Sequence, residues 1–433
     1  MRPDPGSFRD PDSRVVHGPD GRIFRELSAR GAEDFAAFAA SSLFGDPRVI
    51  GTRQAGEALL EHDRVPFVSY PYEWPFGMLK AAALLQLDLL DAALDQRLSL
   101  KDATPYNVQF EGARPVFIDV GSFERLRPDE PWVGYRQFCA LFLYPLMLTA
   151  YRGVSFQPWL RGSLEGIEPA DAAALLPRRR GVTVNARLLA RLERRHRETS
   201  ARATTSQLAR AGFKPEIIRA NVRKLRKIIH QLEWDVPRTA WTDYKADREK
   251  LAFVTAAAER VGPALAWDLG ANDGTFAKAI APHAGTVVAM DADHATVEQL
   301  YRSLDGGNVL PLVADLCDLS PARGWKLAER GTLTDRGRPG LTLSLALIHH
   351  LVITRNVPMA EVLGWLASLG GTHVIEFPHR DDPMVQRLIS AKRSHDTRPE
   401  YDREPFESSL NEQFEVHQRL ELGTRTAYEA VAK

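Results

Sequence analysis

The chain has 433 residues, enough for two or more domains, and its 44% hydrophobic and 26% charged residues are typical of a globular protein with an ample apolar core. Its 56 basic side chains balance its 56 acidic ones, so the net charge points to no particular class of partner. The two cysteines are far apart, which excludes a disulfide framework and a cysteine metal site and favours a reducing, cytoplasmic location.

The beginning of the chain is polar. Residues 1–20 are rich in Pro, Asp and Gly, which predicts a flexible arm without the apolar core of a signal peptide. The most apolar stretch, Phe138–Ala150, is well short of the roughly 20 residues that a membrane span needs. We therefore expect a buried helix there and no membrane partner.

Residues 21–176 predict an α+β domain. Arg22–Leu27 has the composition of a strand, and residues 76–98 form a helix with an apolar stripe on Leu79, Ala83, Leu87, Leu90 and Leu94. Two strand-like pieces follow, Val108–Phe110 and Val116–Val120, joined by the turn-like sequence EGAR. This mixture of strands and helices is what the α+β prediction rests on.

The segment around these two pieces carries a second pattern, Asp102-x-x-x-x-Asn107 followed by Asp119-x-Gly121. It resembles the catalytic and metal-binding loops of protein kinases and aminoglycoside-type phosphotransferases. The resemblance implies that Asp102 orients an attacking hydroxyl group, while Asn107 and Asp119 hold Mg²⁺ on the phosphates of ATP.

The departures from this kinase-like pattern are large. No glycine-rich phosphate loop precedes it, and residues 1–79 contain no lysine, so an arginine such as Arg25 would have to grip the nucleotide. Three interpretations stay open: an active Mg-ATP-dependent phosphotransferase, a degenerate kinase-like domain that binds or presents an acceptor, and an Asx-rich turn beside a hairpin. We favour the degenerate domain.

Residues 177–238 form a basic connector that is predicted to be helical. Between Pro177 and His230 there are 13 Arg and 3 Lys against 3 Glu, in a chain that is neutral overall. Such a segment can bind an anionic acceptor, for example a nucleotide, a phosphorylated glycan or RNA. Aromatic residues are sparse in it, which argues against nucleic acid as a partner, and we favour a solvated helical face.

Residues 239–433 alternate strand-like and helix-like segments and end in FEVHQRLELGTRTAYEAVAK, which predicts a mostly parallel α/β sheet with an antiparallel last strand. The first strand of this domain ends in Asp268-x-Gly270-x-x-x-Gly274. Gly270 permits a tight turn, and Gly274 lets the backbone approach a ligand at the start of the next helix. The third glycine of a nicotinamide-dinucleotide fingerprint is absent, which argues against a dehydrogenase.

Acidic residues also end the next two predicted strands. Asp291 follows Thr286–Met290, and Asp315 follows Val309–Val313. A carboxylate at the end of the second strand is placed to accept both ribose hydroxyls of a bound nucleoside. The alternative is an α/β domain whose glycine turns and acidic helix caps bind nothing.

Two histidines, His349 and His350, end the fourth predicted strand, Leu341–Ile348. Ligands of open α/β sheets bind outside the carboxyl ends of the strands, and histidine is suited to remove a proton near neutral pH. We favour His350 over His349 as the catalytic residue, and the alternative is a structural pair held by backbone hydrogen bonds. No third ligand is in view, so no firm metal site is predicted.

The fifth predicted strand, Thr372–Phe377, carries Glu376 and leads into PHRDDPMVQRL. Glu376, His379 and Asp381 are placed to line a pocket for the acceptor substrate. An exposed loop with a helix cap at Asp382 is the alternative.

The three acidic residues and the glycine turn resemble those of the class I S-adenosylmethionine-dependent methyltransferases, which have a Rossmann-like fold. The resemblance implies that Asp268 accepts a hydrogen bond from the ammonium group of the cofactor and that Asp315 faces its adenine amino group. It also implies that Tyr244, in the segment before the first strand, covers the cofactor as an aromatic lid.

From about residue 20 onward, the whole chain further resembles the nodulation-protein (Noe-type) methyltransferase-like family. The shared motifs are SYPYEWPFGMLKAAAL, LKDATPYNVQF, PVFIDVGSFE, WDLGANDGTF, ALIHHL and EFPHRDDPMVQRL. The resemblance implies methyl transfer from S-adenosyl-L-methionine to an oxygen or nitrogen atom of a small metabolite, a glycan or a natural-product intermediate. The alternatives are an ATP- and Mg-dependent phosphotransferase with an appended nucleoside-binding domain, and a non-catalytic scaffold. The oligomeric state stays open.

Overall fold

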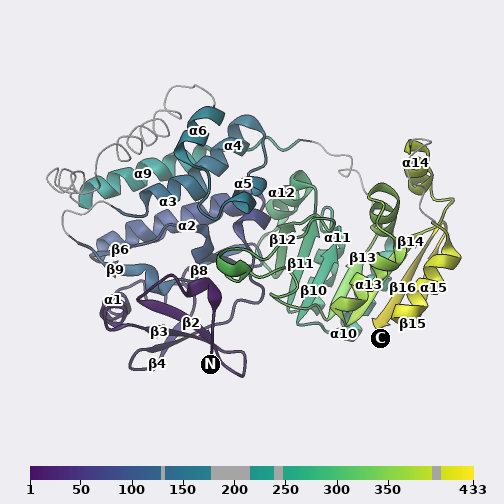
Figure 1. Cartoon of the computed structure of the whole chain (residues 1–433), viewed down its shortest axis with the longest axis horizontal. Helices are drawn as coiled ribbons and strands as arrows, with labels where there is room; N and C mark the ends of the chain where they lie inside the picture. Colours follow the sequence, from purple (N-terminus) through teal and green to yellow (C-terminus); the bar gives the residue numbers. More distant parts are fainter. Residues whose placement is uncertain (128–131, 177–214, 238–246, 393–400) are drawn as a thin grey trace. The chain divides into compact units, whose positions relative to one another are not determined.

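The chain, seen in a computed structural model, divides into two compact units (Figure 1). The structure describes residues 1–127, 132–176, 215–237, 247–392 and 401–433. The first unit comprises residues 1–110, 114–236 and 322–330, and the second comprises residues 111–113, 237–321 and 331–433. The change from the first unit to the second at residue 237 lies close to the predicted domain boundary at residue 239.

An antiparallel sheet of five strands opens the first unit, in the order β1-β2-β3-β5-β4. The strands are β1 (Arg2–Pro3), β2 (Ser13–His17), β3 (Ile23–Leu27), β4 (Thr52–Gly56) and β5 (Leu59–His62). Helix α1 (Ala29–Ala39) lies between β3 and β4 in the sequence. The side chain of Ser28 caps α1 by accepting a hydrogen bond from the N–H of Gly31.

The prediction of a flexible arm over residues 1–20 is wrong, because this segment supplies β1 and β2. All five residues of β2 pair with β3. The N–H of Asp4 donates to the carbonyl of Val15 at 2.8 Å, and the Asp4 carboxylate lies 2.7 Å from Nε2 of His17. Proline and glycine form the turns between these strands, so the composition that suggested a loose segment belongs to the turns.

Helix α2 (Phe76–Asp95) follows the sheet, and its predicted apolar stripe is confirmed by the burial of Leu79, Ala83, Leu87, Leu90 and Leu94. Short strands then pair in two sets, β6 (Leu98–Leu100) with β9 (Phe123–Arg125) and β7 (Val108–Glu111) with β8 (Arg114–Phe117). The next helical segments are α3 (Tyr135–Phe138), the π-helix η5 (Cys139–Leu143), α4 (Tyr144–Arg152), α5 (Gln157–Gly162) and α6 (Pro169–Leu175).

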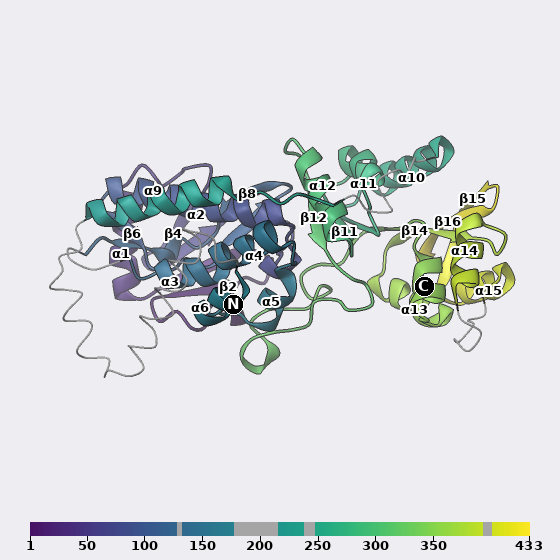
Figure 2. The same cartoon turned by 90° about the horizontal axis from the view of Figure 1, so that it is seen from above.

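Helix α9 (Pro215–Gln231) lies beside α2, as both views of the molecule show (Figures 1 and 2). Arg219 and Arg226 of α9 form ion pairs with Asp91 at 3.2 Å and Asp88 at 2.9 Å on α2. The described end of the predicted basic connector is therefore part of the first unit, and its charge meets acidic side chains of α2. The rest of the basic segment, residues 177–214, lies outside the described residues.

The segment 322–330 falls between two strands of the second unit in sequence, yet it belongs to the first unit. Its Glu329 accepts a hydrogen bond from Arg9 at 2.8 Å, and the Arg330 guanidinium lies 4.4 Å from the centre of the Tyr106 ring. The prediction of one uninterrupted domain over residues 239–433 is therefore wrong at this loop.

The second unit is built on a seven-stranded sheet in the order β12-β11-β10-β13-β14-β16-β15. The strands are β10 (Leu265–Leu269), β11 (Thr286–Asp291), β12 (Val309–Val313), β13 (Leu341–Ser344), β14 (Thr372–Pro378), β15 (Phe414–Leu422) and β16 (Arg425–Ala432). Strands β10 to β14 pair in parallel, and β16 runs antiparallel to both β14 and β15. The predicted Rossmann-like architecture, a mostly parallel sheet with an antiparallel last strand, is confirmed.

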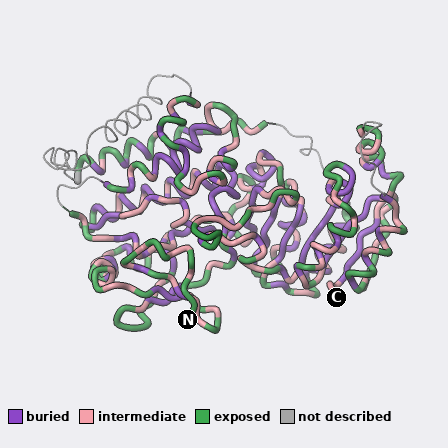
Figure 3. The backbone as a smooth tube through the Cα atoms, viewed as in Figure 1, coloured by how far each residue is buried: buried purple, intermediate pink, exposed green. Residues whose placement is uncertain are grey.

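The helices of the second unit are α10 (Arg248–Val261), α11 (Thr275–Ile280), α12 (His294–Ser303), α13 (Met359–Leu369), α14 (Pro383–Ala391) and α15 (Arg403–Gln413). Buried residues run along the strands of the sheet (Figure 3), because strands covered on both faces are apolar on both sides. Side chains of α10 and α11 pack onto them in one core cluster that includes Val254, Ala258 and Ile280.

Within the part of the chain that the structure describes, no helix combines the length and apolar character that a membrane crossing requires. Neither Cys139, which is buried, nor Cys317, which is exposed, is in a disulfide.

Candidate functional site

The glycine turn after β10 has the backbone conformation that its residues predict. Gly270, Asn272 and Gly274 have positive φ angles of 74°, 49° and 74°, a region that glycine and asparagine tolerate best. The N–H groups of Gly270 and Ala271 donate to the carbonyl of Met290 on β11, at 2.8 and 2.9 Å. These bonds fix the turn at the carboxyl ends of β10 and β11, where such sheets bind their ligands.

Asp268, on β10, is 1% exposed, and burial raises its pKa to about 7. The backbone N–H of Ala277 donates to its carboxylate, but Oδ2 has no hydrogen-bond partner in the described part of the chain. A buried oxygen without a partner is costly, and an ammonium group would supply both the missing hydrogen bond and a compensating charge. Asp268 therefore fits the predicted contact with the amino-acid end of S-adenosylmethionine.

Asp291 ends β11 and joins two loops. Its Oδ2 accepts a hydrogen bond from the N–H of Asn272 at 3.0 Å, and its Oδ1 accepts one from the N–H of Asp293 at 2.8 Å. Burial raises the pKa of Asp291 above its ordinary value, and these backbone donors oppose the rise. Each carboxylate oxygen keeps a second lone pair, so ribose hydroxyls fit here without loss of the existing bonds.

Asp315, just after β12, is already engaged. Its Oδ1 accepts a hydrogen bond from the N–H of Cys317 at 2.9 Å, and its Oδ2 forms an ion pair with Arg355. The predicted contact with an adenine amino group would have to share this carboxylate with Arg355.

The two histidines follow β13 and differ in exposure. His349 is 1% exposed and its Nδ1 lacks a partner among the described residues, whereas His350 is only partly buried. Burial lowers the pKa of His349 to about 3, and His350 and Arg425 add to that effect. Burial and then Arg425 also lower the pKa of His350. Both rings are therefore neutral near pH 7, and His350 is the more accessible of the two.

The loop that leads to the histidines is held by Glu376 of β14. β13 ends at Ser344, short of the predicted end at Ile348, because Ala346 adopts a positive φ of 48°. The N–H of Ala346 donates to Oε2 of Glu376 at 2.6 Å. Positive φ at alanine is strained, so this bond stabilises a turn that alanine does not favour by itself.

Glu376 is also one half of a buried ion pair. Its carboxylate accepts from Nζ of Lys250 on α10 at 2.9 and 3.1 Å, and both side chains are at most 2% exposed. Arg425 of β16 lies 3.6 Å away. The structure thus places Glu376 beneath the loop before the histidines, as a support for that loop, and the predicted contact with the acceptor stays a prediction.

His379 and Asp382 belong to the end of β14 and the start of α14. Nε2 of His379 lies 2.8 Å from Oγ1 of Thr426. Asp382 caps α14 by accepting from the N–H of Met384 at 2.9 Å, and it forms an ion pair with Arg425 at 2.7 Å. The predicted helix cap at Asp382 is confirmed.

Sequence reasoning missed Lys250, although a signal was present. Lys250 stands on the same face of α10 as the buried residues Val254, Ala257 and Ala258, with helical spacing. A lysine on the apolar face of a helix needs a buried carboxylate as its partner. That partner is Glu376, which is 126 residues away in the sequence.

The kinase-like motif of the first unit is brought together in space. The N–H of Ile118 donates to the carbonyl of Asn107 at 2.8 Å, which sets Asp119 beside the Asn107 segment. Burial, and then the nearby Asp119, raise the pKa of Asp102 to about 6. Arg25 of β3 forms an ion pair with Asp119 at 2.7 Å.

Two further predictions concern the aromatic lid and a metal site. Tyr244 falls outside the described residues, so its role as a lid stays a prediction. Across the described ranges, no group of three or more His, Cys, Asp or Glu side chains could hold a metal ion.

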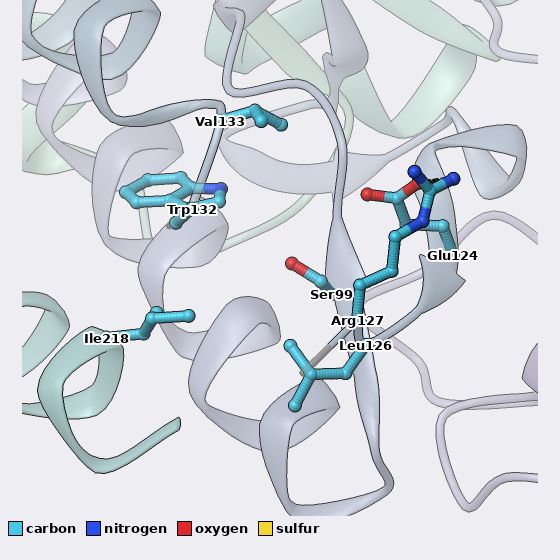
Figure 4. A pocket seen from close by; sticks show the side chains of 7 residues that line it. All are labelled: Ser99, Glu124, Leu126, Arg127, Trp132, Val133 and Ile218. Atoms are coloured by element: carbon cyan, nitrogen blue, oxygen red, sulfur yellow. Dashed lines mark ion pairs between the residues drawn. The ribbon is translucent and has the colours of Figure 1, made fainter. Parts of the chain in front are cut away.

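A cavity of about 20 Å³ is present in the first unit (Figure 4). Its lining comes from Ser99, Glu124, Leu126, Arg127, Trp132, Val133 and Ile218. It has room for about one water molecule, and none of the predicted site residues lines it, so it is no candidate for a substrate site.

Comparison with known proteins gives one strong sequence relative. Nodulation protein NoeA of Rhizobium meliloti (strain 1021) is 34% identical over 439 residues, which cover 95% of this chain and 92% of the relative. No protein-family model matches the chain.

Solved structures give weaker likenesses. The N-methyltransferase NodS of Bradyrhizobium japonicum WM9, in complex with S-adenosyl-L-homocysteine, is 14% identical, with a TM-score of 0.33 over 47% of this chain and 95% of that one. Magnesium protoporphyrin IX methyltransferase of Synechocystis PCC 6803 is 17% identical, with a TM-score of 0.31 over 45% and 91%. Neighbours this distant say nothing about activity by themselves, and none of these likenesses supports the predicted kinase-like domain.

Proposed function

The chain belongs to the family of nodulation protein NoeA, and for this member we propose the activity that its second unit supports best, S-adenosylmethionine-dependent methyl transfer. The acceptor is an oxygen or nitrogen atom of a small molecule or glycan. One observation carries the proposal: Asp268 is a buried carboxylate with an oxygen that lacks a partner, next to a glycine turn and to Asp291. A cationic nucleoside is the ligand that such a set of groups complements.

Each residue of the turn has a task in this proposal. Asp268 accepts a hydrogen bond from the ammonium group of the cofactor, and Asp291 accepts hydrogen bonds from the ribose hydroxyls. Gly270 and Gly274 keep the turn open, since both have positive φ and a Cβ atom at Gly274 would lie 2.4 Å from the Leu300 side chain. When bound, S-adenosylmethionine supplies an electrophilic methyl group for an in-line displacement.

His350 is the proposed general base. It is neutral near pH 7 because burial and Arg425 lower its pKa, so it can take a proton from an acceptor hydroxyl or ammonium group. Glu376 acts through the loop before the histidines. It accepts the N–H of the strained Ala346 turn and thereby positions the backbone that carries His349 and His350. Orientation of the acceptor against the methyl group contributes to the rate beside the base.

Isothermal titration calorimetry with S-adenosylmethionine and its demethylated product tests cofactor binding. Asp291→Ala should weaken both affinities at least tenfold, because the ribose hydroxyls lose their acceptors. Asp305→Ala, a change at an acidic residue away from the turn, is the matched control and should bind as the wild type does. No heat from the wild-type protein, or an unaltered affinity in Asp291→Ala, would overturn the proposal.

The base is tested by turnover. His350→Ala should bind the cofactor normally and lose about 10²- to 10⁴-fold in turnover. The matched change His417→Ala, at an exposed histidine of β15, should have no effect. The acceptor can be found by incubation of isotopically labelled S-adenosylmethionine with metabolite and glycan fractions, followed by mass spectrometry for a labelled methyl product.

A further inference from the structure

A short loop of the first unit exposes large apolar side chains that the methyltransferase proposal does not use. We call residues 322–330 the Trp325 loop, and all of them belong to the first unit. Trp325 is 63% exposed and Leu327 is 68% exposed, and Lys326 between them is exposed as well. Single apolar side chains are common on protein surfaces, but two on one turn, this open to water, suggest an interaction site.

The backbone of the Trp325 loop is strained where these side chains stand. Gly324, Lys326 and Leu327 have positive φ angles of 82°, 55° and 55°. Lysine and leucine rarely adopt this conformation, which glycine or asparagine adopts with less strain. A polar residue would also be better solvated, so neither the turn nor the solvent explains a leucine at position 327. Strain that the fold itself does not require is typical of functional sites.

Hydrogen bonds hold the Trp325 loop in this conformation. The buried carboxylate of Glu329 accepts from the N–H of Trp325 at 2.6 Å and from the guanidinium of Arg9 at 2.8 Å. At the base of the loop, the N–H of Arg323 donates to the carbonyl of Arg330 at 2.9 Å, and the N–H of Arg330 donates to the carbonyl of Arg323 at 3.1 Å. The loop is therefore a closed turn that presents its tip to the solvent.

The 3-10 turn η1 (Pro5–Ser7) packs against the Trp325 loop and brings Phe8 to the same place. A Cβ atom at Gly6 would lie 2.7 Å from Nη1 of Arg330, so the glycine allows the close approach. Phe8 is 45% exposed, and the guanidinium of Arg9 lies 5.6 Å from the centre of its ring. Because Arg9 also bonds to the loop, Phe8 adds a third exposed apolar side chain. We call Phe8, Arg9, Trp325, Lys326 and Leu327 the Trp325 patch.

The charge around the Trp325 patch is positive. The Trp325 loop carries three basic side chains and one acidic side chain, Glu329. Glu329 is paired with a fourth base, Arg9, whose side chain is 62% exposed. Glu165 also interacts with Arg9, and the basic groups still outnumber the acidic ones. An anionic surface therefore complements this part of the molecule.

An anionic lipid surface fits the Trp325 patch better than a protein surface does. A stable protein interface takes about 20–30 residues on each side, whereas the patch offers three large apolar side chains. At the surface of a bilayer, tryptophan is favoured among the head groups, and basic side chains are attracted to anionic lipids. A rigid turn can insert a few apolar side chains there without a matching partner surface.

We propose that the Trp325 patch binds the surface of an anionic phospholipid bilayer, with Trp325 and Leu327 inserted among the head groups and Lys326 and Arg9 beside lipid phosphates. Such binding needs no membrane span. It departs from the sequence-based expectation of no membrane partner, which considered only a span. The proposal does not depend on methyl transfer, because the residues of the patch all lie in the first unit.

Flotation of the full chain with lipid vesicles tests the proposal. Two compositions are compared at low salt, phosphatidylcholine alone and phosphatidylcholine mixed with phosphatidylglycerol. Binding to the mixed vesicles should be at least tenfold tighter than binding to phosphatidylcholine alone, and it should weaken as salt is added. Absence of binding to the mixed vesicles, or equal binding to both compositions, overturns the proposal.

Variants locate the lipid-binding surface. The double variant Trp325→Ser, Leu327→Ser and the charge reversal Lys326→Glu should each weaken binding to the mixed vesicles at least tenfold. Val154→Ser, at another exposed apolar residue, and Lys224→Glu, at an exposed lysine of α9, are the matched controls and should bind as the wild type does. Wild-type binding in both test variants, or a loss confined to Lys224→Glu, would place the surface elsewhere and refute the proposal.

Fluorescence separates insertion from adsorption by charge alone. The chain has eight tryptophans, so quenching by brominated lipid is compared between the wild type and Trp325→Phe. Because phenylalanine is also apolar, Trp325→Phe should keep vesicle binding while it loses the quenched part of the fluorescence. Equal quenching in the two proteins would show that Trp325 does not enter the bilayer.

The same proteins identify other occupants of the Trp325 patch. Self-association that the double variant abolishes, without vesicle binding, would assign the patch to a second copy of the chain. Quenching of Trp325 by soluble oligosaccharides, without vesicle binding, would assign it to a glycan. Either result overturns the lipid proposal. All the changed side chains are exposed, so thermal denaturation of each variant should match that of the wild type and show that lost binding is not caused by unfolding.

Discussion

In the first unit, the carboxylate of Asp119 lies 2.7 Å from the guanidinium of Arg25, whereas in the second unit Asp268 is more deeply buried and has an oxygen without a partner. The second unit also holds a fully paired example, because Glu376 bonds to Lys250 at 2.9 Å. The comparison separates two uses of a buried carboxylate. A buried carboxylate that is paired with a cation of the chain holds backbone and loops in place. A buried carboxylate that lacks such a partner is the site where a cationic ligand would be bound most favourably.

The largest expected effect comes from removal of the cation beside Glu376. Lys250→Met should lower the free energy of unfolding by about 3–5 kcal/mol, because Glu376 loses two charge-assisted hydrogen bonds in the core and keeps only the more distant Arg425, at 3.6 Å, as a cation. Urea denaturation at neutral pH measures it. The exposed pair Arg380–Asp402 provides the control, and Arg380→Met should cost less than about 1 kcal/mol. A Lys250→Met protein as stable as this control would contradict the structural role given to the pair.

Removal of the buried cation in the first unit should lower the free energy of unfolding by a smaller amount. Arg25→Met leaves Asp119 without its cation, but that side chain is 16% exposed and water can reach it. We expect a loss of about 2–3 kcal/mol in the free energy of unfolding, measured in the same urea series. A loss larger than that of Lys250→Met would reverse the order of burial inferred for the two pairs.

Gly121→Ala sharpens the comparison at the Arg25–Asp119 ion pair. Its Cβ atom would meet Ser13 and Arg25, so the free energy of unfolding should fall by about 1–3 kcal/mol. Gly364→Ala on α13 is the matched change, since nothing lies within 4 Å of its Cβ position. It should be neutral or stabilising by up to about 1 kcal/mol. Thermal or urea denaturation of both variants should show opposite signs, and a shared sign would speak against the close approach.

The smallest expected effect is a pH dependence of cofactor affinity that arises from Asp268. Burial raises the pKa of Asp268 to about 7, so below that pH the ligand-free protein holds a proton that a bound ammonium group must displace. Affinity for S-adenosylmethionine should therefore fall as the pH drops below 7, by up to about tenfold per pH unit. Calorimetry between pH 5.5 and 8 measures this slope. The Asp268→Asn variant should bind S-adenosylmethionine weakly, and its affinity should not show this pH dependence.

The free energy of unfolding of the ligand-free protein should depend on pH in the opposite direction. The pKa of Asp268 is 3.8 as a reference and higher in the folded chain, so the folded state holds more protons between the two values. The stability contribution of this group is present below pH 3.8 and is lost as the pH rises toward about 7. Asp268→Asn should remove this loss, so without ligand it should be more stable than the wild type at pH 8. Equal stability at pH 8 would show that the carboxylate is not strained by burial.

Local patterns were enough for some of these features. The apolar stripe of α2 follows from helical spacing, and the turn from Gly270 to Gly274 follows from the residues that tolerate positive φ. The strand ends that carry Asp291 and Asp315 follow from apolar runs that stop at a charge. Each of these depends on residues close together in the sequence.

Other features depend on residues that meet only in the folded chain. The partner of Lys250 lies 126 residues away. The sequence therefore shows a lysine on the apolar face of a helix but does not show which carboxylate pairs with it. The early end of β13 depends on a hydrogen bond from Ala346 to a different strand. β1 and β2 were missed because the pairing of β1 with β2 and of β2 with β3 outweighs a composition that favours turns.

The strained Ala346 turn has a consequence for how acceptors are selected. Because Glu376 accepts hydrogen bonds from both the N–H of Ala346 and the ammonium group of Lys250, the loop before His349 is tied to β14 and α10. In the proposed methyl transfer, movement of the histidines would then not serve to accommodate an acceptor of a different size. We therefore expect the choice of acceptor to depend on side chains other than Glu376 and Lys250.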